Sequence, residues 1–323
     1  MIKYIIKRLL LSVLILLGVS LILFILIQNM PSSFAENKIN EMNAGGAIVD
    51  QATKDAIMKM YDMSYGEWLK RIVTLDFGES FTQSMPVVDV IKRDMLVSFL
   101  VAAIATVFEF MIAIPLGITA ATHQYSIRDY VVTVLVMVGI SLPSFFFGQV
   151  LKGVFSTGLG WLPSSGLGDA TQSTVGFAQM LEHARYLILP ILTVVILSIG
   201  GRMRMTRTNM LEVLNSDYIR TARAKGCAER TVIWKHALKN ALLPVITVIG
   251  NSFGAMFGGT VIIERLFSVQ GIGTFMVDGI NNRDVPVVTG CVVTIAVVYS
   301  LVTMLVDVLY AYIDPRTKAR FIK

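Results

Sequence analysis

The residues best arranged to do chemistry lie in a basic run, DYIRTARAKG, which occupies 217–226. Arg220 and Arg223 are three residues apart, and residues at this spacing share one face of a helix. Asp217 is a candidate N-cap, and Gly226 is a candidate helix stop because glycine readily takes the left-handed backbone that closes helices. The chemistry that this pattern predicts is polar binding of a partner by a short helix.

The other side of this helix is predicted to be apolar, because Tyr218, Ile219 and Ala222 fall together on it. A surface helix lying on anionic lipid would explain the positive charge. A lipid-bound helix would not explain why the helix stops at Gly226 and a membrane helix follows so closely. That arrangement indicates a segment that transmits movement of the loop to the membrane helix. The second helical piece starts at Glu229 and places four apolar residues on one face: Ile233, Ala237, Leu238 and Ala241.

Polar and small residues inside apolar runs form a second set of candidates. Glu109 is a candidate for a role in transport, because burying an unpaired carboxylate in lipid costs several kcal/mol. The alternative, which we favour, is a glutamate near a subunit interface, or one that takes a proton and hydrogen-bonds locally. Gly250, Gly254 and Gly258 share one helix face beside Asn251, and this face serves either tight helix packing or the wall of a substrate pathway.

Metal and nucleotide chemistry find no support in the sequence. Cys227 and Cys291 lack metal-ligand spacing and are expected on opposite sides of the membrane, and the three histidines are scattered. The phosphate loop G-x-x-x-x-G-K-[ST] does not occur. We therefore expect no catalytic, cofactor or metal site on this chain, and hence no enzyme activity of its own.

The composition indicates that these residues are held by a polytopic membrane protein. Of 323 residues, 54% are hydrophobic and 15% are charged, against about a quarter charged in soluble domains. Apolar runs of about 20 residues suit a bilayer, where backbone groups must be paired within their own helix. Six runs predict an all-α protein with six transmembrane helices: 9–27, 96–121, 131–151, 186–201, 241–263 and 287–313.

The distribution of basic residues predicts how this bundle is oriented in the membrane. One set of loops and both termini hold 17 Lys and Arg against 5 acids, and the other set holds 11 against 15. Because Lys and Arg in short loops resist translocation, the first set is predicted to be cytoplasmic. The net charge of +6 is thus a topology signal, and nucleic-acid binding is not needed to explain it. The predicted parts are an uncleaved first helix (1–28), an extracytoplasmic segment (29–94) with helical pieces at 51–60 and 65–73, a five-helix core (95–315) with a cytoplasmic loop (202–240), and a cytoplasmic tail (316–323).

DYIRTARAKG, followed by VIWKHALKNALLPVIT, resembles the cytoplasmic coupling loop of bacterial ABC importer permeases of the oligopeptide, dipeptide and nickel group. ERLFSVQGIG and YAYIDPR resemble stretches of the same group, and the likeness spans almost the whole chain. The long segment after the first helix resembles the first of the two permease subunits. At 30–33 the chain has MPSS where many relatives carry a Pro-Gly-Asp-Pro turn. The resemblance therefore does not define the conformation of the outer segment or its contact with the substrate-binding protein.

The resemblance implies the type I ABC importer permease fold and a set of partners in the bacterial cytoplasmic membrane. These partners are a second homologous permease subunit, two ATPase subunits that would bind ATP and Mg²⁺, an extracytoplasmic substrate-binding protein, and membrane lipid. Residues implied to couple to the ATPase are Asp217, Tyr218, Arg220, Thr221, Ala222, Arg223, Ala224, Lys225 and Gly226. Residues implied to lie in an external loop near the binding protein are Glu264, Phe267, Gly271, Gly273, Arg283 and Asp284.

Peptides are the cargo that the resemblance implies first, with nickel, other metal chelates or opine-like solutes as alternatives. A secondary transporter that works without nucleotide is a competing class. The predicted spans lack the paired buried charges of an ion relay, and no internal repeat is found, both of which count against that class. A membrane scaffold without transport would leave Glu109 and the prolines of the helices without a role.

Overall fold

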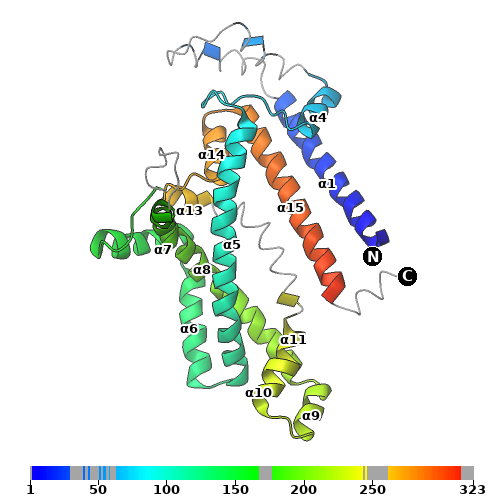
Figure 1. Ribbon diagram of the computed structural model, residues 1–323, viewed down its shortest axis with the longest axis vertical. Helices are drawn as coiled ribbons and strands as arrows, with labels where there is room; N and C mark the ends of the chain where they lie inside the picture. The colour runs from blue at the N-terminus through cyan, green and yellow to red at the C-terminus, as the bar shows by residue number, and fades with distance from the viewer. Residues whose placement is uncertain are drawn as a thin grey trace. The chain divides into compact units, whose positions relative to one another are not determined.

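The computed structural model describes most of the chain, and it falls into two compact units (Figure 1). One unit comprises Leu96–Thr274 and Leu301–Lys323, and the other comprises Ile2–Met95 and Phe275–Ser300. Regular structure within the described residues is nearly all helical, as predicted. The described residues are 2–29, 39–40, 43, 51, 54–55, 58, 63–166, 177–242, 244–245 and 261–313.

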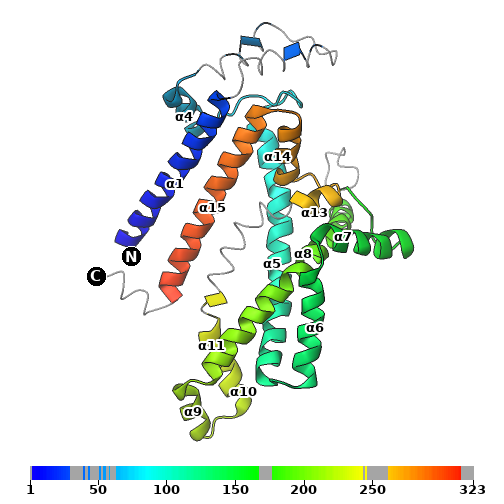
Figure 2. The ribbon, with the colours of Figure 1, turned by 180° about the vertical axis from the view of Figure 1, so that it is seen from behind.

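The larger unit is organised around α8 (Phe177–Leu214), a helix of 38 residues. α5 (Val87–Thr122) forms an antiparallel hairpin with α6 (Ile127–Ser141), and α6 packs along α8 (Figure 1). The turn between α5 and α6 lies at the same end of the unit as α9 (Figure 2). The remaining elements of this unit are α7 (Ser144–Lys152), η1 (Gly153–Gly158), α9 (Asp217–Ala224), α10 (Glu229–Thr231), η2 (Val232–Ala237), α11 (Leu238–Ala241) and α13 (Val261–Leu266), whereas α14 (Ile272–Asn281) only begins in it and continues in the second unit.

The second unit contains α1 (Ile2–Gln28), α4 (Tyr65–Val73) and the first part of α15 (Val285–Ile313). The predicted helix at 65–73 is confirmed, and it begins with a capping box in which Ser64 and Glu67 satisfy each other's backbone N–H groups. α4 packs on α1 through the buried indole of Trp68. The other predicted helical piece, 51–60, lies largely outside the described residues.

The predicted membrane spans are confirmed in three places and changed in two. The runs 9–27, 96–121 and 287–313 lie within α1, α5 and α15. The run 241–263 lies largely outside the described residues. Four described helices are long and apolar enough to cross a membrane, Ile5–Gln28, Val87–Thr122, His183–Leu214 and Val285–Val308, and a fifth span results if α6 and the helix after it count as one.

The predicted single helix at 131–151 is wrong, because the chain bends by 102° between α6 and α7. The break falls at Leu142 and Pro143. Leu142 takes an extended backbone conformation (φ −93°, ψ 138°), which is what the ring of a following proline imposes on the residue before it. Pro143 then serves as the residue that starts α7.

The predicted span 186–201 is too short, since α8 continues to Leu214. Its 38 residues extend about 57 Å, well beyond the roughly 30 Å of a hydrocarbon core. The predicted loop 202–240 therefore begins only after Leu214. The predicted span ended just before Arg202, but arginine is a good helix former, and both Arg202 and Arg207 are paired inside the unit.

α5 and α8 approach each other closely at Gly117. A Cβ atom there would lie 2.6 Å from Cβ of Thr206 and 2.9 Å from the carbonyl oxygen of Met203 on α8. The neighbouring small residues Ala113 and Ala120 on α5 are fully buried. The crossing of the two helices thus depends on the missing side chain at 117.

We predict that Gly117→Ala lowers the thermal stability of the protein. Overpacking of this kind costs about 1–3 kcal/mol, and the contact includes backbone that cannot move aside. Gly201→Ala on α8 is the matched control, because a Cβ there meets nothing within 4 Å and alanine favours the helix by up to about 1 kcal/mol. Thermal unfolding in detergent, followed by tryptophan fluorescence, measures both. Equal stability of the two variants would contradict the close crossing.

Candidate functional site

The short basic helix predicted around Arg220 is confirmed as α9, which begins at Asp217 and ends at Ala224. The cap residue is Ser216 rather than Asp217, and the Ser216 hydroxyl donates to the carbonyl of Val213 instead of capping. Asp217 lies in the first turn, where a negative charge interacts favourably with the helix dipole. Gly226 follows the helix with φ +78°, the left-handed conformation that was predicted for a stop.

The apolar side of α9 is buried, but it is narrower than predicted. Ile219 is fully buried and Ala222 is 8% exposed, so both predictions are confirmed. Tyr218 is 45% exposed, and placing it on the buried face was wrong. The buried arc is centred between Ile219 and Ala222, and Tyr218 lies at its edge, where its hydroxyl accepts a hydrogen bond of 3.0 Å from Asn240 Nδ2.

The polar side of α9 is exposed. Arg220 Nη1 lies 3.7 Å from Asp217 Oδ1, and both side chains are largely in solvent, so this ion pair contributes little to the stability of the fold. Lys225 is also exposed. Thr221 is exposed as well, with its hydroxyl donating to the carbonyl of Asp217 at 3.0 Å, and so is Ala224.

Arg223 differs from the other cations of the helix because a forked pair of hydrogen bonds holds it to a carboxylate beyond the helix. Its Nε and Nη2 donate to the two carboxylate oxygens of Glu229 at 3.1 and 2.7 Å. These hydrogen bonds hold the pKa of Glu229 below its usual value and raise the pKa of Arg223. The pair spans the turn at 225–228 and joins α9 to α10. Of the three cations among the predicted coupling residues, Arg220 and Lys225 are the ones left to bind another protein.

The segment after the turn packs against the end of α8. Ala237 and Ala241 are buried, with Ile233 and Leu238 packed beside them, which confirms the predicted apolar face. Val232 was missed, although it is fully buried. Its burial follows from the π-helical backbone of η2, because the wider turn with i→i+5 hydrogen bonds brings Val232 and Ala237 onto one side.

This packing makes one apolar cluster of the coupling candidates and α8. Ile219 of α9 and Val232 of η2 meet Met210 of α8, and all three are fully buried. Asn209 Nδ2 also donates to the carbonyl of Ala241 at 3.4 Å. The exposed cations of α9 are thus fixed to the end of a helix that is long enough to cross a membrane.

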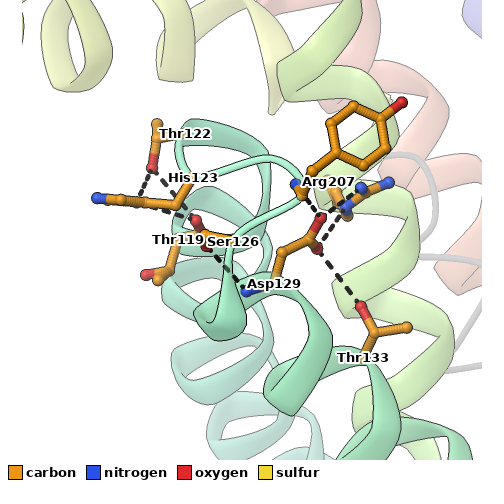
Figure 3. A network of polar contacts seen from close by, with 8 residues as sticks. Thr119, Thr122, His123, Ser126, Asp129, Thr133 and Arg207 are labelled. Atoms are coloured by element: carbon orange, nitrogen blue, oxygen red, sulfur yellow. Dashed lines mark hydrogen bonds and ion pairs between the residues drawn. The ribbon is translucent and has the colours of Figure 1, made fainter.

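For Glu109 the predicted alternatives were a transport role, a place near a subunit interface, and a protonated carboxyl with local hydrogen bonds. In the structure its partner is Arg202 of α8. The Glu109 carboxylate is 2% exposed and accepts from Arg202 Nε at 2.5 Å. A second pair joins Arg207 of α8 to Asp129 of α6, with bonds of 3.0 and 2.8 Å (Figure 3). Neither pair was predicted, although three arginines within six residues beside apolar runs signalled that carboxylate partners were needed.

The predicted external-loop residues are mostly buried within their own units. In the larger unit, Glu264 is 2% exposed and accepts from Ser98 Oγ at 2.7 Å and from the N–H of Thr274 at 3.0 Å. Phe267, Gly271 and Gly273 are buried as well, and a Cβ on Gly273 would lie 2.9 Å from Oε2 of Glu264.

Asp284 plays the equivalent part in the other unit. It is fully buried, and its Oδ2 accepts from Ser80 Oγ at 2.8 Å and from the N–H and Oγ1 of Thr82 at 3.0 Å each. Arg283, with φ 54°, is exposed. Among the six residues predicted to lie near a binding protein, Arg283 is therefore the one whose side chain can reach a partner directly.

The remaining candidates give no site that the structure describes. Gly250, Asn251, Gly254 and Gly258 lie outside the described residues, so their predicted packing or pathway role is untested. Within the described residues, no three His, Cys, Asp or Glu side chains are close enough to hold a metal ion.

Several apolar helices of spanning length identify a multi-pass membrane protein. Residues 113–319 match the family described as the binding-protein-dependent transport system inner membrane component. The chain belongs to this family, the permease family of ABC transporters.

Curated relatives match the chain over nearly its full length. It is 36% identical to the dipeptide transport system permease protein DppB of Alkalihalophilus pseudofirmus, over 98% of this chain and all of that protein. It is also 36% identical to the oligopeptide transport system permease protein AppB of Bacillus subtilis, over 98% of this chain and 99% of that one.

A solved structure shares the fold. The MetNI methionine ABC transporter in an inward-facing conformation aligns with a TM-score of 0.55 and 16% identity, over 70% of this chain and 96% of the matched chain. The predicted ABC importer permease fold is thus supported by a structure as well as by sequence.

We predict that Glu229→Gln increases backbone amide hydrogen exchange at 225–228, because the side-chain oxygen of glutamine is a weaker acceptor for Arg223 than the carboxylate of Glu229. Low pH should lower the protection factors of the same amides, once the intrinsic pH dependence of amide exchange is divided out. Since the pKa of Glu229 is lowered in the fold, the bridge contributes stability above the unfolded pKa and loses it as pH falls through the folded pKa.

Hydrogen-exchange mass spectrometry of the detergent-solubilised protein measures this effect. Asp217→Asn is the control, since the Asp217 carboxylate lies at the far end of α9 and its contact within the helix is the long one with Arg220, so the turn at 225–228 should remain unchanged. Unaltered exchange at 225–228 in Glu229→Gln would show that the bridge does not hold the turn.

Proposed function

We propose that this chain is one permease subunit of an ATP-driven importer that carries peptides across the bacterial cytoplasmic membrane. Two relatives that match over nearly the whole chain carry names of dipeptide and oligopeptide permeases, which supports peptides as cargo. The observation that carries the proposal is α9 itself, with its exposed cations on one side and its apolar side packed on α8.

The partners proposed are a second homologous permease subunit, two ATPase subunits and an extracytoplasmic binding protein. ATP and Mg²⁺ belong to the ATPase subunits, and this chain is not catalytic. α9 and both termini are cytoplasmic, in keeping with the excess of Lys and Arg in their loops. On the opposite side, Arg283 is the proposed contact with the binding protein.

α9 is proposed to dock in a groove of the ATPase subunit. Arg220 and Lys225 are available to carboxylates or carbonyl groups of that groove, because both are exposed. Ile219 and Ala222 are not available, since they pack against α8. Closure of the ATPases on ATP would push α9, and the apolar cluster would pass the push to α8 and so into the membrane.

The test of this function is uptake by the assembled complex in proteoliposomes. Labelled dipeptides and oligopeptides should accumulate when ATP and the binding protein are present, and should not accumulate without ATP. Uptake that continues without ATP and stops when a proton gradient is collapsed would instead show a secondary transporter. Uptake of nickel that peptides do not inhibit would reassign the cargo.

We predict that Gly226→Val uncouples ATP hydrolysis from uptake. A β-branched residue is strained at φ +78°, so the turn that follows α9 must change, whereas a Cβ there meets no neighbouring atom. Gly226→Asn is the matched control, because asparagine tolerates left-handed backbone. Uptake per ATP should fall about tenfold in Gly226→Val and remain near the wild-type value in Gly226→Asn. Normal coupling in Gly226→Val would contradict the role of this turn.

A further inference from the structure

Asp129, in the first turn of α6, gathers hydrogen bonds from two different parts of the larger unit (Figure 3). It is 5% exposed. Arg207 Nε donates to its Oδ1 at 3.0 Å, and Arg207 Nη2 donates to its Oδ2 at 2.8 Å, in the forked geometry typical of strong arginine–carboxylate pairs. Oδ2 also accepts from the N–H of Tyr125 at 3.1 Å, and Oδ1 lies 3.5 Å from Thr133 Oγ1.

The bond from Tyr125 ties this carboxylate to the turn between α5 and α6. Tyr125 has φ 62°, a left-handed conformation that a bulky residue rarely adopts. Strained residues of this kind persist only where surrounding contacts fix them. Here Asp129 holds the Tyr125 N–H, while Ser126 Oγ accepts from the N–H of Asp129 at 3.3 Å. The conformation of the turn therefore depends on the Asp129 carboxylate, whose charge is balanced by Arg207 of α8.

α8 is tied in two directions by its arginines. Arg202 and Arg207 are five residues apart, so they point about 140° away from each other around the helix. Arg202 reaches Glu109 on α5, and Arg207 reaches Asp129 on α6. Both helices of the hairpin are thus attached to one helix. Arg207 also lies only two turns before the end of α8, where the cluster that holds α9 is found.

A buried ion pair is a poor way to add stability, because removing two charges from water offsets most of their attraction. It does provide a fixed direction and a fixed register, which apolar contacts alone allow to slide. The Asp129–Arg207 pair has both features: two parallel bonds, and an acceptor that is locked by its own turn.

We propose that Asp129 and Arg207 are positioning residues that make the α5–α6 hairpin move as one piece with α8. The proposal rests on the function proposed above and deepens it. When the ATPase moves α9, α8 carries the hairpin along through this pair. Without the pair, α8 moves against α6, and ATP hydrolysis continues without completing the change of access in the membrane.

The experiment compares peptide uptake with ATP hydrolysis in proteoliposomes that contain the whole complex. Asp129→Asn should lower the uptake per ATP about tenfold, with hydrolysis and the amount of assembled complex little changed. Arg207→Lys keeps the charge but loses the fork, and should give an intermediate ratio. Exchanging the two charges, with Asp129→Arg and Arg207→Asp together, should give a higher uptake per ATP than Asp129→Arg alone or Arg207→Asp alone. Arg204→Gln is the control, because exposed Arg204 on the same helix reaches α6 only through a weak contact with the sulfur of Met137 and pairs with no carboxylate in the described part of the chain.

Three results would overturn the proposal. The first is a wild-type ratio in both Asp129→Asn and Arg207→Lys. The second is an equal loss in Arg204→Gln. The third is a loss of uptake that matches a loss of assembled complex in every variant, which would make the pair structural only. Failure of the wild-type complex to take up peptide would instead reject the proposed function, and is thereby distinguished from failure of the pair.

Discussion

The arrangement of the larger unit depends on the need to pair charges that lie on a long helix among apolar neighbours. Arg202 and Arg207 cannot remain unmatched in such surroundings without a large cost, and Glu109 and Asp129 are the carboxylates that match them. Because each carboxylate belongs to a different helix, pairing also decides which helices lie beside α8. α8 can therefore continue beyond its apolar run as an unbroken helix, and it ends where α9 is needed.

At that end, the interaction changes from charge to apolar packing. Ile219 and Val232 close on Met210, and the π-helical turns of η2 bring a second face into the cluster. The polar groups of α9 are left at the surface, except for Arg223, which Glu229 engages to close the turn. One end of α8 thus carries a surface suited to a partner, and its middle is fixed to two neighbouring helices. This division is what an element needs if it is to convert docking into movement.

Features that depend on nearby residues could be predicted from the sequence. The bounds of α4, the helix at α9 and the left-handed backbone at Gly226 follow from caps, spacing and glycine within ten residues. Features that depend on distant partners could not. Glu109 and Arg202 are 93 positions apart, Ser98 and Glu264 are 166 apart, and Ser80 and Asp284 are 204 apart. Because these partners could not be found from the sequence, the span of α8 was predicted to end before Arg202. For the same reason, the buried Glu264 and Asp284 were predicted to lie in a loop near a binding protein.

The most direct test of the account is the distance between α6 and the segment that follows α9 in the working complex. Spin labels at exposed Tyr130 and exposed Arg230, with Cys227 and Cys291 replaced by serine, allow pulsed electron paramagnetic resonance to measure it without nucleotide and with ATP. If α8 carries both elements together, the distance should be the same in the two states. A change of about one helical turn, ~5 Å, would show that the docking segment swings independently of the membrane helices and would contradict the account.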